Sequence, residues 1–148
     1  MIIATSIKLA WFANALQVIR KSALDFIRFS FAFYNAKVEL AFEVTPREVE
    51  DRRQAGEMLC LIDVREDSEW RICRIEGASL VPMNTVPARV LELEAQADAT
   101  PIIVYCHHGV RSLHVVHWLR RNGVENCQSM MGGIERWSME IDTSVPRY

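Results

Sequence analysis

Lysine, glycine and proline are scarce in this chain and unevenly placed along it. The lysines are Lys8, Lys21 and Lys37, all within the first 40 residues, whereas all six glycines and all five prolines come later. A stretch without glycine or proline favours helix, because these two residues are the strongest breakers of regular structure. The sequence therefore predicts two parts: a helical extension of unknown role over residues 1–40 and a domain over residues 41–148.

The chain has little net charge of either sign. The 17 basic and 19 acidic residues leave a formal net charge of −2. We therefore expect no nucleic acid partner, because domains that bind nucleic acids carry a strong basic excess. Half of the 148 residues are hydrophobic and 24% are charged, which is the balance and the length of a single globular domain.

Cysteine is not arranged as a disulfide or zinc framework. The chain has four cysteines and no Cys-x-x-Cys pair, and it is longer and more hydrophobic than small secreted domains that depend on disulfides. We expect free thiols in a reducing, cytoplasmic environment, without a metal or another cofactor.

The sequence also lacks a long uninterrupted hydrophobic run. The apolar stretch over residues 2–19 contains Lys8, Asn14 and Gln17, so it falls short of the about 20 mostly apolar residues of a transmembrane helix. It also lacks the basic start and cleavage site of a signal peptide. Residues 1–40 are rich in aromatics and carry five basic against two acidic residues. We favour an appendage that packs on the domain or a partner, over a helix on a membrane surface or a segment without native importance.

Residues 41–148 alternate between short apolar runs and helical patterns. This alternation indicates an α/β domain with a parallel sheet. A capping box, Thr45 to Glu48 with Pro46 at the first helical position, marks the first helix of the domain. The expected strands are 41–44, 58–64, 78–81, 101–105 and 126–130, and the expected helices are 45–55, a short one capped by Ser68, 87–95, 112–121 and 134–141.

One strand is followed at once by a thiol, a glycine-containing turn and a helix. Ligands of parallel sheets bind at the carboxyl ends of strands, and Cys106 lies at such an end. Four residues separate Cys106 from Arg111, so the turn is tight enough for its backbone N–H groups to surround the sulfur and favour the nucleophilic thiolate. Arg111 adds a cation with paired donors for an anionic sulfur donor, and Gly109 permits a positive φ.

This loop resembles the active-site loop of the rhodanese family, whose form is Cys-x-x-Gly-x-Arg. The resemblance covers residues 42–148 and implies a central, mostly parallel sheet of about five strands flanked by helices, with sulfurtransferase activity through a persulfide on Cys106. Arg74 departs from the pattern, since single-domain members often have histidine there. The other matching segments are residues 61–66, residues 75–78 followed by Val81-Pro82, and residues 131–134 with Trp137.

The candidate site residues fall into three groups. Cys106 is the expected catalytic nucleophile. Asp63 and Arg65 are candidate supporting residues, although a turn cap and an ion pair are the simpler roles for them. His114 and His117 share one helix face, but we expect them on its polar side and not at a metal. The expected substrate-binding residues of the loop are His107, His108, Gly109, Val110, Arg111 and Ser112.

The expected partners are a small sulfur donor such as thiosulfate and a thiol acceptor, either a small molecule or a thioredoxin-like protein. A cysteine phosphatase or arsenate reductase is the main alternative enzyme, but its loop has five residues between cysteine and arginine, which suits a larger oxyanion. A protein-to-protein persulfide relay, docking through residues 1–40, is the alternative outside small-molecule catalysis. It would use the same Cys106 chemistry.

Overall fold

A computed structural model of the chain describes residues 40–148. The helical extension predicted over residues 1–40 therefore lies outside the described residues, apart from Leu40. The described elements, in chain order, are β1 (Glu43–Val44), α2 (Pro46–Gln54), β2 (Cys60–Asp63), α3 (Asp67–Ile72), β3 (Ser79–Leu80), the 3-10 helix η1 (Met83–Arg89), α4 (Val90–Ala99), β4 (Ile102–Tyr105), α5 (Val110–Arg121), β5 (Cys127–Met130) and α6 (Gly133–Glu140).

The five strands form one sheet in the order β1-β5-β4-β2-β3, and every neighbouring pair is parallel. The predicted α/β class and the predicted parallel sheet are thus confirmed. Strand β4 lies at the centre, between β2 and β5, and all four of its residues are buried. Continuous burial of this kind is expected for a strand covered on both faces by helices.

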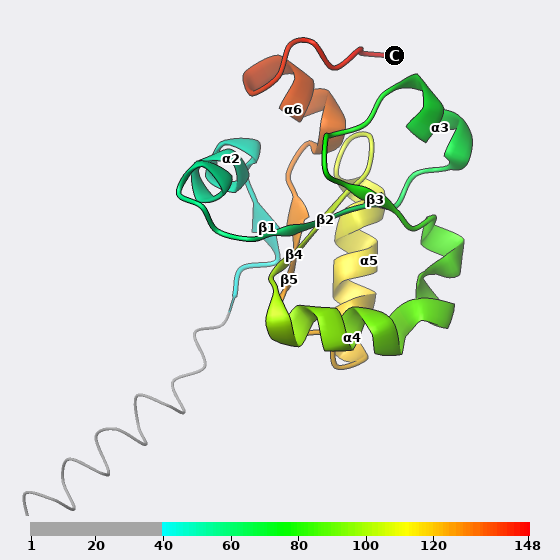
Figure 1. Cartoon of the computed structure of the whole chain (residues 1–148). Coiled ribbons are helices and arrows are strands. Elements are labelled where there is room, and N and C mark those ends of the chain that lie inside the picture. Colours follow the sequence, from blue (N-terminus) through cyan, green and yellow to red (C-terminus); the bar gives the residue numbers. More distant parts are fainter. Residues whose placement is uncertain (1–39) are drawn as a thin grey trace, which may run out of the picture. The chain divides into compact units, whose positions relative to one another are not determined.

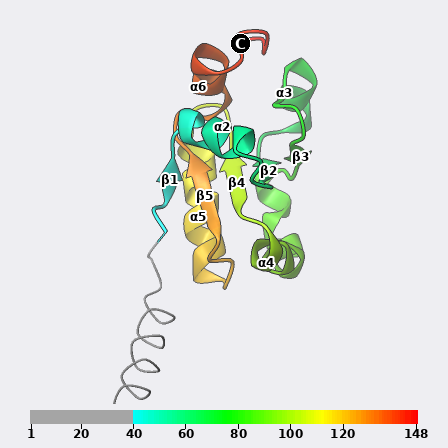
Figure 2. The same cartoon turned by 60° about the vertical axis from the view of Figure 1, so that its left-hand side comes forward.

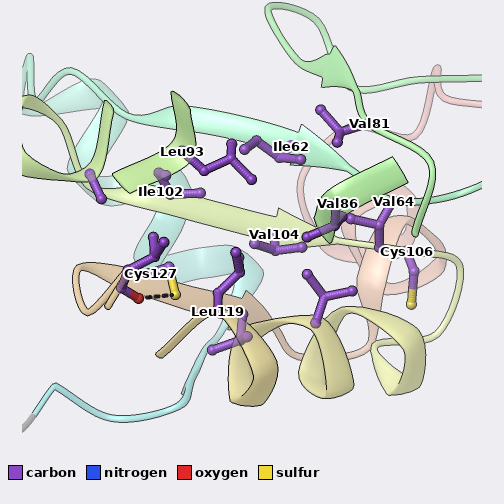
Figure 3. Packing of buried hydrophobic residues seen from close by; sticks show 14 residues of the cluster. Ile62, Val64, Val81, Val86, Leu93, Ile102, Val104, Cys106, Leu119 and Cys127 are labelled. Carbon is purple, nitrogen blue, oxygen red and sulfur yellow. Dashed lines mark hydrogen bonds between the residues drawn. The ribbon is translucent and has the colours of Figure 1, made fainter. Parts of the chain in front are cut away.

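Two hydrophobic cores lie on opposite faces of the sheet, because alternate residues of a strand point to opposite sides. Ile102, Val104 and Cys106 contribute to one core, and Ile103 and Tyr105 contribute to the other. Figure 3 shows the first core, in which the strands β2 and β4 pack against side chains from η1, α4 and α5. The second core includes Val49 of α2 and Trp137 of α6.

Capping residues set the starts of α2 and α3, of which the first was predicted correctly and the second was not. The first helix is capped as predicted: Glu48 N–H donates to Thr45 Oγ1 at 3.2 Å, and Thr45 N–H donates to Glu48 Oε2 at 2.8 Å. The prediction that Ser68 caps the next helix is wrong. Glu66 is the N-cap of α3, and its N–H donates to Glu69 Oε2 at 3.0 Å, so the helix begins earlier than expected.

Two further boundaries also differ from the predictions. Helix α5 begins at Val110 and not at Ser112, because Gly109 serves as its N-cap with a φ of 91°. Pro87 lies inside the 3-10 helix η1, and the following α-helix starts only at Val90. The first error concerns a glycine turn, whereas the second concerns a 3-10 helix that continues directly into α4.

The carboxyl ends of the parallel strands meet at one edge of the sheet, and the loop after β4 lies at this edge. Figures 1 and 2 show α3, α6 and this loop gathered at the same end of the sheet, while α4 lies at the other end. Within residues 40–148, no helix has both the length and the hydropathy needed to cross a bilayer.

Candidate active site

Cys106 follows β4 directly, and its side chain is 2% exposed. Figure 3 shows it beyond Val104, at the end of the strand. The N–H of Gly109 donates to Cys106 Sγ at 3.1 Å, and Ser112 Oγ lies 3.6 Å from the same sulfur. Two donors from the loop and from the first turn of α5 therefore converge on one sulfur atom, an arrangement that favours negative charge there.

Ser112 has three neighbours for one hydroxyl proton. Its Oγ lies 3.0 Å from the carbonyl oxygen of Gly109 and 2.9 Å from Ser129 Oγ, in addition to the Cys106 sulfur. A hydroxyl donates one proton at a time, so it donates to the Gly109 carbonyl or to the sulfur, while Ser129 can donate to it. A small reorientation of a fully buried hydroxyl is thus enough to strengthen the donation to sulfur.

The first turn of α6 fixes the loop backbone. Ile134 N–H donates to the carbonyl of Cys106 at 2.9 Å, and Glu135 N–H donates to the carbonyl of His107 at 3.1 Å. These helix-terminal N–H groups have no partner within their own helix, so the loop carbonyls satisfy them. Two carbonyls of the loop therefore face α6, while the N–H of Gly109 faces the sulfur.

Glycine is required where α6 meets the loop. A Cβ on Gly133 would lie 2.3 Å from the carbonyl oxygen of Cys106 and 2.4 Å from that of His107. A Cβ on Gly109 would lie 2.9 Å from the backbone nitrogen of Gly132. The two backbone segments thus approach each other more closely than any side chain permits.

Arg111 is already paired in the structure. Its guanidinium donates to both carboxylate oxygens of Glu69 at 2.7 Å. Glu69 also accepts from Tyr148 Oη at 2.9 Å and from the N–H of Glu66 at 3.0 Å. The hydrogen bonds from Arg111 are the main reason that the pKa of Glu69 falls to about 2, and the same pair raises the pKa of Arg111.

Asp63 and Arg65 form an ion pair at the end of β2, and both side chains are fully buried. Arg65 donates to both oxygens of Asp63, to the carbonyl of Cys73 at 2.7 Å and to Tyr148 Oη at 2.8 Å. Burial alone would lower the pKa of Arg65, but the contacts with Asp63 and Tyr148 raise it. Through Tyr148, this pair is connected to Glu69.

The remaining loop residues lie nearer to the surface. The ring of His107 stacks on that of Tyr148, with 4.2 Å between centroids, and lies 3.9 Å from the ring of His108. Burial, followed by the nearby His108, lowers the pKa of His107. His108 and Val110 are exposed. Of the predicted loop residues, Gly109 and Ser112 are thus buried around the sulfur, two are exposed, and His107 and Arg111 are half-buried.

Glu69, Gly133 and Tyr148 belong to this site but were not singled out from the sequence. Glu69 is 42 residues from Arg111 along the chain, so no local spacing links the two. The Gly132-Gly133 pair was noted only as a turn and as part of the family pattern.

Cys127 and His117 have partners outside the loop. Cys127 Sγ donates to the carbonyl of Val124 at 3.1 Å, and burial raises its pKa to about 11. The ring of His117 stacks on Phe42, whereas His114 is exposed. All four cysteines are free thiols. Over residues 40–148, no group of three histidine, cysteine, aspartate or glutamate side chains is placed to hold a metal ion.

Known proteins share this domain. The thiosulfate sulfurtransferase GlpE of Haemophilus influenzae is 34% identical over 106 residues, which cover 69% of this chain and 95% of that protein. The probable adenylyltransferase/sulfurtransferase MoeZ of Mycobacterium tuberculosis is 32% identical over 105 residues, 71% of this chain but only 26% of that longer protein.

Solved structures agree with the sequence comparisons. The crystal structure of a rhodanese-like domain protein from Staphylococcus aureus superimposes with a TM-score of 0.61 at 26% identity, covering 73% of this chain and 99% of that one. The sequence profile of the rhodanese-like domain matches residues 45–140. The chain therefore belongs to the rhodanese-like domain family.

Proposed function

We propose that this protein is a sulfurtransferase in which Cys106 accepts a sulfane sulfur and carries it as a persulfide. The observation that carries the proposal is the buried Cys106 sulfur, with the N–H of Gly109 at 3.1 Å and the Ser112 hydroxyl at 3.6 Å. Donors fixed in this way stabilise a negative charge on sulfur with little reorganisation during the reaction. The thiosulfate sulfurtransferase named above supports the same chemistry.

The reaction consists of two displacements on sulfur. The Cys106 thiolate attacks the outer sulfur of thiosulfate, a new S–S bond forms, and the old S–S bond breaks so that sulfite leaves with its electron pair. Cys106 then carries –S–S⁻. The thiolate of an acceptor attacks the terminal sulfur, takes it as a persulfide and releases the Cys106 thiolate. Charge and electrons balance in each step, and no external oxidant is required.

The position of Arg111 supports sulfur transfer over phosphatase chemistry. An oxyanion-binding loop needs its arginine to face the tetrahedral anion, but here both terminal nitrogens of the guanidinium donate to Glu69. The loop is also short, with four residues between Cys106 and Arg111, and it is pressed against α6. A small cradle of this kind suits one additional sulfur atom.

Mass spectrometry of the intact protein after incubation with thiosulfate tests the proposal. We expect a gain equal to one sulfur atom, mapped to Cys106 and reversed by a small thiol. Cys106→Ser should show no gain, because a hydroxyl cannot form a persulfide. Cys60→Ser is the matched control, since Cys60 is a half-buried free thiol on β2, and it should load sulfur normally. Sulfur on another cysteine and not on Cys106 would refute the assignment.

The acceptor is proposed to be a thiol, either a small molecule or a thioredoxin-like protein. His108 and Val110 are the exposed loop residues beside the buried sulfur, so they would meet the acceptor first. Multiple turnovers with thiosulfate and a small thiol alone would support small-molecule catalysis. Loading without turnover until a protein acceptor is added would support the relay.

A further inference from the structure

We propose that Glu69 determines which sulfur donor the site prefers: by neutralising Arg111, it disfavours dianionic donors such as thiosulfate relative to persulfides of thiols, which carry less charge. This inference rests on the proposed sulfurtransferase function. Glu69 lies on α3 and takes no part in the persulfide chemistry itself. Its proposed role is to select the chemical class of the sulfur donor.

The pairing of Arg111 with Glu69 neutralises the charge of the guanidinium and uses one N–H of each terminal nitrogen. Both carboxylate oxygens of Glu69 accept from the guanidinium at 2.7 Å, in the two-pronged geometry that makes such pairs strong. The Glu69 side chain is 18% exposed and that of Arg111 is 36% exposed, so the pair is screened less than one at the open surface.

Neutral hydrogen-bond donors also hold Glu69 in place. Tyr148 Oη donates to Glu69 Oε1 at 2.9 Å and accepts from Arg65 at 2.8 Å. The N–H of Glu66, at the start of α3, donates to Glu69 Oε2 at 3.0 Å. Glu69 is therefore held by two donors besides Arg111, and moving it away from Arg111 would break both of these contacts.

The charges around the site cancel one another. Arg65 is paired with Asp63, and Arg111 is paired with Glu69, so these four described residues contribute a net charge of zero. A dianion approaching Cys106 meets no unpaired guanidinium in this cluster, so little net attraction offsets the hydration that it loses. A donor with one charge or none loses less hydration. The site thus discriminates by leaving the charges of the wrong donor without a partner.

A persulfide donor delivers the same sulfur. The Cys106 thiolate attacks the outer sulfur of a protonated persulfide R–S–SH, a Cys106 S–S bond forms, and R–S⁻ leaves with the electron pair of the broken bond. The proton remains on the transferred sulfur. The step balances without sulfite and without any co-reactant.

Steady-state kinetics with thiosulfate and with the persulfide of 2-mercaptoethanol, which carries at most one negative charge, test the proposal on the full-length protein. Glu69→Gln keeps the shape and the hydrogen-bond acceptor for Tyr148 but removes the charge. We expect its KM for thiosulfate to fall about three- to tenfold, while kcat/KM for the persulfide changes by less than about twofold. The double variant Glu69→Gln/Arg111→Ala should lose the gain, because the released guanidinium is what binds the dianion.

Glu92→Gln is the matched control. Glu92 makes the same two-pronged contact with Arg89, but on α4, at the end of the sheet away from Cys106. Its kinetics with both donors should equal those of the wild type.

The wild-type protein offers a test that needs no variant. If Arg111 is neutralised, the KM for thiosulfate should change little with ionic strength, whereas a free cation would make it rise with salt. A steep salt dependence in the wild type, or an unchanged or higher thiosulfate KM in Glu69→Gln, would overturn the donor-selection role. Sulfur loading of Cys106 in the same samples would then leave the proposed function intact. Wild-type protein that takes sulfur from neither donor would overturn both.

Discussion

Gly133 shows how a single atom can decide the geometry of the candidate site. It lies in the first turn of α6 with a φ of 58°, and its hydrogen faces the carbonyl oxygens of Cys106 and His107. Any side chain there would displace the backbone that fixes the N–H of Gly109 against the sulfur. Glycine is therefore required for two reasons: a side chain would clash with these carbonyl oxygens, and the positive φ disfavours any residue that has a Cβ.

Gly133→Ala should lower the rate of sulfur loading by about a hundredfold, the effect typical of reacting groups displaced by about 1 Å. Gly56→Ala is the matched control, because Gly56 also has a positive φ, of 83°, but a Cβ there would meet nothing within 4 Å. It should lose some stability and keep its activity. Thermal melts and loading kinetics for both variants would separate strain from displacement, and equal activities would argue against a positioning role for Gly133.

The low pKa of Glu69 also predicts how acid affects the stability of the protein. Its pKa in the folded protein is about 2, against an ordinary value of 4.5, so the folded state binds the proton less readily than the unfolded state. The stabilisation is therefore complete above about pH 4.5 and is lost as the pH falls toward 2. Glu69→Gln should show a smaller loss of unfolding free energy between pH 5 and pH 2 than the wild type, measured by urea denaturation. Parallel pH profiles would contradict the low pKa.

At the scale of elements, two helices serve the loop in different ways. α6 holds its carbonyls, and α3 holds Arg111, so the loop depends on segments on both sides of it in the sequence. The Thr45 capping box and the buried run of β4 were predictable, because their causes lie within a few residues. The partner of Arg111 was not, since Glu69 lies 42 residues away along the chain. The start of α3 was missed although its cause is local, because its N-cap is Glu66 and not one of the usual capping residues.

Inserting one residue between Val110 and Arg111 tests how sulfur loading depends on the length of the loop. The insertion lies in the first turn of α5 and would rotate Ser112 by about 100° around the helix, away from the Cys106 sulfur. We expect the yield of Cys106 persulfide to fall about tenfold or more. The same insertion between Asn122 and Gly123, after the last turn of α5, should have little effect on the yield. Normal loading in the first variant would show that the loop length does not set the chemistry.

At the scale of the whole molecule, residues just before β1 are tied to the domain. Arg120 donates to the carbonyls of Leu40 and Ala41, and its guanidinium lies 4.2 Å from the centre of the Phe42 ring. Gln128 also donates to the carbonyl of Ala41, at 3.1 Å. The domain boundary proposed from composition, near residue 41, therefore falls beside contacts that stabilise the edge strand.

A chain shortened to residues 40–148 should fold and load sulfur on Cys106, because the whole sheet and the loop lie within it. A chain that starts at Glu43 should melt at least about 5 °C lower, since it lacks the acceptors for Arg120 and Gln128. Circular dichroism melts of both chains beside the full-length protein provide the comparison. An unfolded or inactive 40–148 chain would show that the domain extends further toward the N-terminus.

The contacts that α6 makes with the loop also bear on the order of events during synthesis. Cys106 leaves the ribosome before Ile134 and Glu135, whose N–H groups hold the carbonyls of the loop. Until they arrive, those carbonyls bind water, and the thiol has no fixed cradle. On the proposed function, the nascent chain would hold an ordinary cysteine first and gain the fixed cradle around its sulfur only when α6 docks, so sulfur loading would begin with the completion of the fold.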